Sequence, residues 1–189
     1  QLRISYFCNM IRTKTAGMSR TSLSRLAKKG EIERVARGLY VRPEDEITEQ
    51  HSLVEAVCLV PKGIICLLSA LSFHDLTTQS PHQVWMALDI NARKIPKISH
   101  PPLRVVWFSG PALEFGVEEH VLEGHAVKIT SAAKSVADCF KYRNKIGIDI
   151  AVEALRDYLR GAKSWDSLWE ASKVCRMTKI MEPYLAALS

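Results

Sequence analysis

The chain has 189 residues, of which 26 are Lys or Arg and 20 are Asp or Glu, so its formal net charge is +6. Because 47% of the residues are hydrophobic, the chain is long and apolar enough to bury a core in one or two domains. Its apolar runs are short and are interrupted by Pro61 or His74, which excludes a membrane-spanning helix of about 20 apolar residues. We therefore expect a soluble, cytoplasmic protein with no membrane partner.

Positive charge is concentrated at the start of the sequence. Residues 1–42 contain ten Lys or Arg against only two acidic residues, Glu31 and Glu33, which gives this segment a net charge of +8. The remaining residues, 43–189, contain 16 basic and 18 acidic side chains, a net charge of −2. This asymmetry predicts a polyanion-binding segment joined to a nearly neutral body.

A short helix is predicted within the basic segment, beginning after Ser19 and ending at Gly30. Serine is a favourable N-cap, and glycine adopts the left-handed conformation with which many helices end. Leu23, Leu26 and Ala27 recur at helical spacing and are expected to pack inward. The polar side of this helix then carries Arg20, Thr21, Ser24, Arg25 and Lys28. Residues 1–12 contain an apolar cluster and are expected to belong to the first helix of the same domain.

A basic β-hairpin is predicted directly after this helix. Its strands are residues 32–35 and 39–41, with Arg37 and Gly38 at the turn, and Arg34 and Arg42 also lie along it. A helix followed by such a hairpin is typical of a winged helix-turn-helix that binds double-stranded DNA. An amphipathic helix alone is equally typical of an ordinary protein surface, and the hairpin together with the charge asymmetry favours DNA binding. We expect Arg20, Thr21, Ser24 and Arg25 to contact bases, Lys28 and Lys29 to contact phosphates, and Arg34 and Arg37 to act from the hairpin.

The rest of the sequence predicts an α+β domain with a helical C-terminal end. The charge pattern changes after Arg42, so we place the winged domain at residues 1–46 and the α+β domain at residues 47–189. Trp85 and Trp107 lie on predicted central strands and are expected in the core. The predicted helices cover 49–60, 64–73, 131–142, 148–159, 165–174 and 179–188, and the predicted strands cover 83–90, 103–109, 117–122 and 126–129.

A second basic cluster follows in the C-terminal half, formed by Lys134, Lys141, Arg143 and Lys145. A solvated helix face is the ordinary explanation for such a cluster, and contact with DNA or with an acidic partner is the functional alternative.

Catalytic and metal-binding motifs are not found in the sequence. No phosphate-binding loop, zinc-protease helix or nucleophile elbow occurs, so we expect no enzyme, no cofactor and no metal site. Ser69, His74 and Asp75 are the best remaining candidates for a nucleophile and its base, but a structural role is favoured for them. The widely spaced cysteines are expected to be buried, reduced thiols; they are Cys8, Cys58, Cys66, Cys139 and Cys175.

Three stretches of the sequence together resemble a known family. They are residues 23–40, residues 69–76 and residues 129–139, the last of which opens with Ile129-Thr130-Ser131 and ends with Ala137-Asp138-Cys139. In this order they look like the AbiEi family of transcriptional regulators and antitoxins. The resemblance implies a type IV toxin–antitoxin antitoxin that represses its own operon and counteracts a nucleotidyltransferase-like toxin without forming a stable complex with it.

Two other classes of function remain open from the sequence. The first is a stand-alone, ligand-responsive transcription factor without a toxin. This class would be favoured if no toxin gene lies beside the gene for this chain. The second is a DNA-processing enzyme targeted by the winged domain, whose activity would be lost in EDTA. Because one winged helix reads only a few base pairs, we expect inverted repeats in the promoter to be bound by more than one copy.

Overall fold

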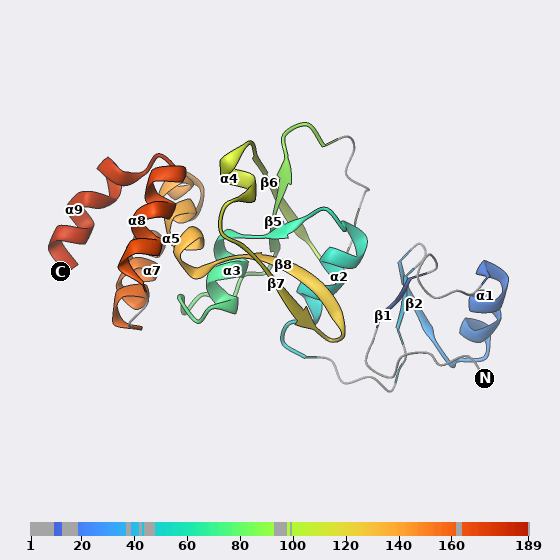
Figure 1. Cartoon of the computed structure of the whole chain (residues 1–189). Coiled ribbons are helices and arrows are strands. Elements are labelled where there is room, and N and C mark those ends of the chain that lie inside the picture. The colour runs from blue at the N-terminus through green and yellow to red at the C-terminus, as the bar shows by residue number, and fades with distance from the viewer. Residues whose placement is uncertain are drawn as a thin grey trace. The chain divides into compact units, whose positions relative to one another are not determined.

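The fold is mixed α+β, as predicted, in the computed structural model of the chain (Figure 1). The structure describes residues 10–12, 19–36, 39–41, 43, 48–92, 98, 100–161 and 164–188, and these residues form nine helices and two sheets. The chain divides into two compact units, Gln1–Pro61 with His120–Val127, and Lys62–Glu119 with Lys128–Ser189. The domain boundary predicted after residue 46 falls among residues outside this description and stays a prediction.

The N-terminal elements are a three-stranded antiparallel sheet and one helix. Strand β1 (Met10–Arg12) precedes helix α1 (Arg20–Lys28), and strands β2 (Glu33–Ala36) and β3 (Leu39–Val41) follow it. The sheet has the order β1-β3-β2. The predicted helix and hairpin strands are thus confirmed. The prediction of a helix through residues 1–12 is wrong at Met10–Arg12, because the backbone there pairs with β3; residues 1–9 lie outside the described residues.

The second sheet has five strands in the order β6-β5-β4-β8-β7. Strand β4 (Ile64–Ile65) runs antiparallel to β5 (Val84–Asp89) and parallel to β8 (His125–Thr130), and β5 runs parallel to β6 (Leu103–Phe108). Strand β7 (Val117–Leu122) lies at the far edge and leads into β8, as predicted for a hairpin.

Two predictions about this sheet are wrong. Ile64 and Ile65 were expected in a helix, but they form β4 because both neighbouring strands satisfy their backbone groups; a short apolar run does not distinguish a strand from a buried helix. The strand that contains Trp107 was expected to be central, but β6 is an edge strand. Trp107 consequently remains 44% exposed, whereas Trp85 on β5 is buried as predicted.

Helices pack against the second sheet and extend beyond it toward the C-terminus (Figure 1). The predicted C-terminal helices are confirmed, and α5 is buried among α3, α7, α8, α9 and the sheet. The helices are α2 (His51–Leu59), α3 (Leu67–Phe73), α4 (Pro111–Glu114), α5 (Ala132–Lys141), α6 (Arg143–Ile146), α7 (Ile148–Arg160), α8 (Trp165–Val174) and α9 (Thr178–Leu188).

An ion pair lies inside this core on helix α5. Lys134 is fully buried, and its ammonium group contacts the carboxylate of Asp138 one turn later. The ammonium also lies 4.7 Å from the centre of the Phe108 ring, and the Cys175 thiol donates a hydrogen bond of 3.2 Å to the second oxygen of Asp138. The prediction of Lys134 as part of a surface cluster is therefore wrong, because its side chain points into the core.

Removal of the Asp138 carboxylate is expected to destabilise the protein strongly. Asp138→Ala leaves the Lys134 ammonium buried without its partner, which costs about 3–5 kcal/mol for a buried ion pair. Urea unfolding followed by circular dichroism measures this loss. The double variant Lys134→Met with Asp138→Leu is the control, because it removes both charges and is expected to recover most of the stability. A loss below about 1 kcal/mol in Asp138→Ala would contradict this account.

A hydrogen-bond network ties the β7–β8 turn to the start of α2. One oxygen of the Glu123 carboxylate accepts a bond of 2.7 Å from the Thr48 hydroxyl, and the other lies 2.9 Å from Nδ1 of His51. At the other end of α2, the Cys58 sulfur lies 3.5 Å from Nδ1 of His125 on β8. Burial alone would raise the pKa of Glu123, but the hydrogen bonds from Thr48 and His51 and the attraction to His51 lower it on balance. The ionised carboxylate is therefore the form that this network holds.

Glu123→Gln is expected to remove an acid-sensitive contribution to stability. Because the folded pKa of Glu123 lies below its unfolded value, the carboxylate stabilises the fold above the unfolded pKa and loses this effect as pH falls through the folded pKa. Urea unfolding near pH 7 and below about pH 4 should therefore show a difference between wild type and variant that shrinks in acid. A difference that is constant over this range would contradict the assignment.

Candidate nucleic-acid interface

Helix α1 begins and ends at the residues that the sequence predicts. The Ser19 hydroxyl accepts a hydrogen bond of 3.1 Å from the Ser22 N–H, which satisfies one of the free donors at the helix start. Beyond the C-cap residue Lys29, Gly30 has a φ of +77°, a conformation that glycine adopts without strain. Arg25 and Lys28 lie in the last turn, where positive charge interacts favourably with the helix dipole.

A small apolar core fixes which side of α1 faces the sheet. Leu23 is completely buried against Ile32 and Tyr40, and Leu26 and Ala27 pack at the border of this cluster. The three residues predicted to point inward thus do so. Because this contact sets the rotation of the helix, it also determines which side chains face outward.

The outward face of α1 is polar and basic. Thr21, Arg25 and Lys28 lie opposite Leu23 around the helix, and the side chains of Arg20, Thr21, Ser24, Arg25, Lys28 and Lys29 are all exposed. Glu31 is the nearest acid in sequence, and its carboxylate lies 3.8 Å from the Lys29 ammonium. Both partners are mostly exposed, so this pair contributes little stability and leaves the basic character of the face intact.

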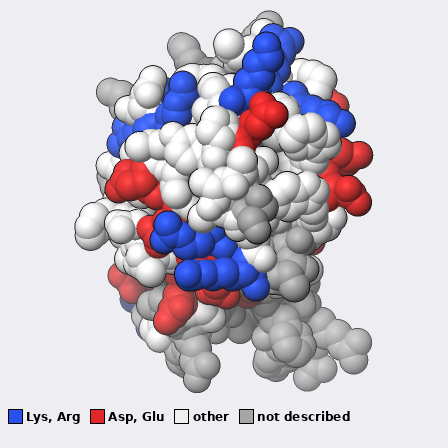
Figure 2. Space-filling view, turned by 90° about the vertical axis from the view of Figure 1, so that its left-hand side faces the viewer, with Lys and Arg blue, Asp and Glu red and all other residues white. Residues whose placement is uncertain are grey.

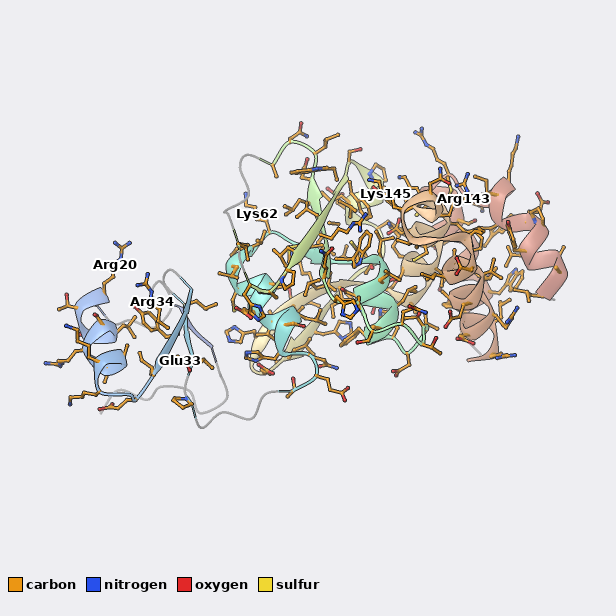
Figure 3. All side chains as sticks on the ribbon, turned by 180° about the vertical axis from the view of Figure 1, so that it is seen from behind. Arg20, Glu33, Arg34, Lys62, Arg143 and Lys145 are labelled. Carbon is orange, nitrogen blue, oxygen red and sulfur yellow. The ribbon has the colours of Figure 1, made fainter. Side chains whose placement is uncertain are left out.

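Arg34 extends the same basic surface from the sheet. In the antiparallel register Arg34 lies opposite Tyr40, and directly opposite residues share one face of a sheet. Because Tyr40 packs against α1, Arg34 is placed on the side of the sheet that carries the helix. Figure 3 shows Arg20 and Arg34 projecting toward the same side, with Glu33 on the opposite side. The remaining hairpin candidate, Arg37, lies outside the described residues.

The predicted second basic cluster does not form one surface. Lys134 is buried, as described above, whereas Lys141 and Lys145 are exposed on α5 and α6. The Arg143 guanidinium donates a hydrogen bond of 2.9 Å to the carbonyl of Phe140, and the Lys145 ammonium lies 5.4 Å from the centre of the Tyr142 ring. Arg143 and Lys145 project from neighbouring positions in Figure 3. Of the four predicted residues, solvent therefore reaches only Lys141, Arg143 and Lys145.

The side chains of Ser69 and His74 both contact backbone groups. The Ser69 hydroxyl accepts a hydrogen bond of 2.9 Å from the Trp85 N–H and so joins α3 to strand β5, in keeping with the structural role expected for it. His74 Nε2 lies 2.8 Å from the carbonyl of Thr130, in keeping with the structural role expected for it.

The described cysteines are buried free thiols, as predicted. They are Cys58, Cys66, Cys139 and Cys175, while Cys8 lies outside the described residues. Burial raises the pKa of the Cys66 and Cys139 thiols well above their usual value, and that of Cys175 to about 12. Such thiols are protonated at neutral pH and are therefore poor nucleophiles and poor metal ligands. Within the described part of the chain, no group of three or more His, Cys, Asp or Glu could hold a metal ion.

Leu23→Ala is expected to disrupt the N-terminal elements selectively. The substitution removes most of a fully buried side chain from its cluster with Ile32 and Tyr40, at a cost of about 2–5 kcal/mol. Limited proteolysis should therefore cleave the variant faster within residues 19–41, while cleavage within α5–α9 stays unchanged. Thr21→Ala on the exposed face of the same helix is the matched control. Equal protection of residues 19–41 in Leu23→Ala and in the control would contradict the proposed packing.

Comparison with known proteins supplies a family for the N-terminal elements alone. No helix among the described residues is long and apolar enough to span a membrane. No curated protein matches the chain. Residues 10–43, which comprise β1, α1, β2 and β3, match the family described as "Transcriptional regulator, AbiEi antitoxin", which confirms over this segment the family that the sequence resembles.

Proposed function

We propose that the chain is a DNA-binding transcriptional regulator of the AbiEi antitoxin type. The observation that carries this proposal is the exposed face of α1, where arginine, lysine, serine and threonine side chains are held outward by the burial of Leu23. The family match over residues 10–43 covers the same elements and supports the same reading. A net charge of +8 over residues 1–42 supplies the attraction to the phosphate backbone.

In this proposal α1 lies in the major groove of DNA. The groove is about 12 Å wide and admits one helix, and Arg, Ser and Thr side chains can hydrogen-bond to base edges there. Arg20, Thr21, Ser24 and Arg25 read bases, and Lys28 and Lys29 at the helix end bind phosphates. Arg34 and Arg37 contact the backbone or the adjacent minor groove from the hairpin.

The same elements form a winged helix-turn-helix domain over residues 1–46 in this account. The order β1-β3-β2, with α1 between β1 and the hairpin, supports this assignment because it provides a helix for one groove and a hairpin wing beside it. Residues 47–189 then form the α+β domain of the antitoxin. Because α1 spans only nine residues, it reads few base pairs, and the promoter is expected to carry inverted repeats.

The antitoxin part of the proposal names a nucleotidyltransferase-like toxin as the functional counterpart, without a stable complex between the two. It is tested by expressing a toxin of this class, encoded beside the gene, with and without this chain. Relief of growth arrest by the wild-type chain supports the antitoxin role. Arrest that persists at equal expression levels would contradict that role and leave DNA binding as a separate question.

Two alanine variants on α1 distinguish base reading from phosphate binding. Arg25→Ala is expected to cost about 1–3 kcal/mol on the DNA upstream of the chain's own gene and to relax preference at one base pair. Lys28→Ala is expected to weaken binding to all duplexes alike and to reduce the slope of log K against log salt by about one. Fluorescence anisotropy with cognate and scrambled duplexes at several salt concentrations measures both effects.

The control for these variants is Lys62→Ala, which removes an exposed positive charge in the other compact unit (Figure 3). Its affinity for both duplexes should stay within about twofold of wild type, because it lies outside the proposed interface. Equal losses of DNA affinity in all three variants would contradict the roles proposed for Arg25 and Lys28. Equal affinity of the wild type for cognate and scrambled DNA would contradict them as well.

A further inference from the structure

Helix α8 exposes two tryptophans on one side. Trp165 is 47% exposed and Trp169 is 37% exposed, although large aromatic side chains are usually more buried than this. The two residues are four positions apart, so they lie on the same side of the helix one turn from each other. Lys173 follows after another turn, and its ammonium lies 5.6 Å from the centre of the Trp169 ring. These three side chains form a continuous stripe about 12 Å long.

The stripe is held by a firmly anchored helix. Leu168, Ala171 and Ser172 on the inner side of α8 are buried, and the Ser164 hydroxyl caps the helix by accepting from the Ser167 N–H. The Tyr158 hydroxyl on α7 donates a hydrogen bond of 2.8 Å to the Ser164 carbonyl, which joins the start of α8 to its neighbour. Because α8 is fixed on its inner side, its backbone does not need to become ordered when it meets a partner, so little backbone entropy opposes an interaction.

The two charged residues at the ends of the stripe are complementary to each other. Asp166 and Lys173 are both exposed and are seven positions apart, so they lie on the same side of α8 at opposite ends of the stripe. When two such helices meet antiparallel about a twofold axis near Trp169, Asp166 of each copy lies opposite Lys173 of the other. In a parallel arrangement, like charges would face each other instead.

The surroundings of the stripe also fit a copy of the same chain better than DNA. Figure 2 looks at the end of the molecule that carries α7, α8 and α9 and shows basic and acidic side chains interspersed around uncharged ones. Asp166 and Glu170 are exposed beside the tryptophans and would repel phosphates. Residues 43–189 have a net charge of only −2, so long-range repulsion between two copies of this part of the chain is weak.

We propose that α8 is the self-association surface of this protein, where a second copy binds in antiparallel orientation through Trp165, Trp169, Asp166 and Lys173. In many protein interfaces a few central residues, often tryptophans, contribute most of the binding free energy, and charged residues lie at the border. A twofold axis makes the same patch serve both copies. The inference does not depend on the proposed function, because it concerns the C-terminal unit and needs no DNA.

Sedimentation velocity of the full chain without DNA tests the proposal. An interface centred on one helix is small, so we expect a reversible monomer–dimer equilibrium in which the weight-average mass rises between about 1 and 200 µM. Trp169→Ala and, separately, Lys173→Asp are expected to weaken association at least about tenfold. The exchange variant Asp166→Lys with Lys173→Asp keeps the two charges complementary and is expected to associate like the wild type. Lys179→Asp, which makes the same charge change at an exposed position on α9, is the matched control.

The exchange variant tests the charge contact independently, even if one of the single variants is misfolded. Restored association in this variant, together with weak association of Lys173→Asp, supports the antiparallel contact. A wild-type chain that stays monomeric over the whole concentration range would overturn the proposal. Association that is equally strong in Trp169→Ala, Lys173→Asp and the Lys179→Asp control would overturn it as well, because the contact would then lie elsewhere.

Discussion

The contact of Leu23 with Ile32 and Tyr40 is the interaction on which the candidate interface depends. It holds a nine-residue helix that is too short to be stable alone in water, and it fixes the rotation of that helix on the sheet. The outward direction of Thr21, Arg25 and Lys28 follows from this rotation. A bound polyanion would add to the stability of these elements by mass action, because it binds their folded form.

The second unit contains a buried ion pair in its core. Helix α5 is buried on all sides and nevertheless contains Lys134 and Asp138, and the pair is tolerated because each charge neutralises the other while Phe108 and Cys175 complete their surroundings. Burial raises the pKa of Asp138, and the Lys134 ammonium opposes this change. The sheet and the C-terminal helices pack around this helix and present α8 with its tryptophans outward.

Much of this organisation could be predicted from the sequence, and the failures have identifiable causes. Ser19 and Gly30 marked the ends of α1, because capping and positive φ are local properties that a few residue types satisfy. The apolar run predicts a helix at Ile64 and Ile65, whereas the strand that they form depends on pairing with β5 and β8, which are far away in the sequence. The exposure of Trp107 depends on β6 being an edge strand, which no local pattern indicates.

The candidate site could also be predicted only in part. Helical periodicity predicts the basic face of α1, whereas the charge of Lys134 favours a surface position that the structure contradicts. The apolar residues on both sides of Lys134 and the spacing of four to Asp138 were the signals that could have indicated a buried pair. The contacts of Glu123 with Thr48 and His51 link positions more than 70 residues apart and left no signal in the sequence.

Hydrogen exchange of the full chain with and without the DNA upstream of its own gene tests the central claim most directly. The account predicts that this DNA, and not a scrambled duplex, slows amide exchange in residues 20–28 and 33–41, because these elements contact the groove and gain stability from binding. Exchange within α5–α9 should stay nearly unchanged. Protection that is absent from residues 20–28, or equal with both duplexes, would contradict the claim that α1 reads DNA.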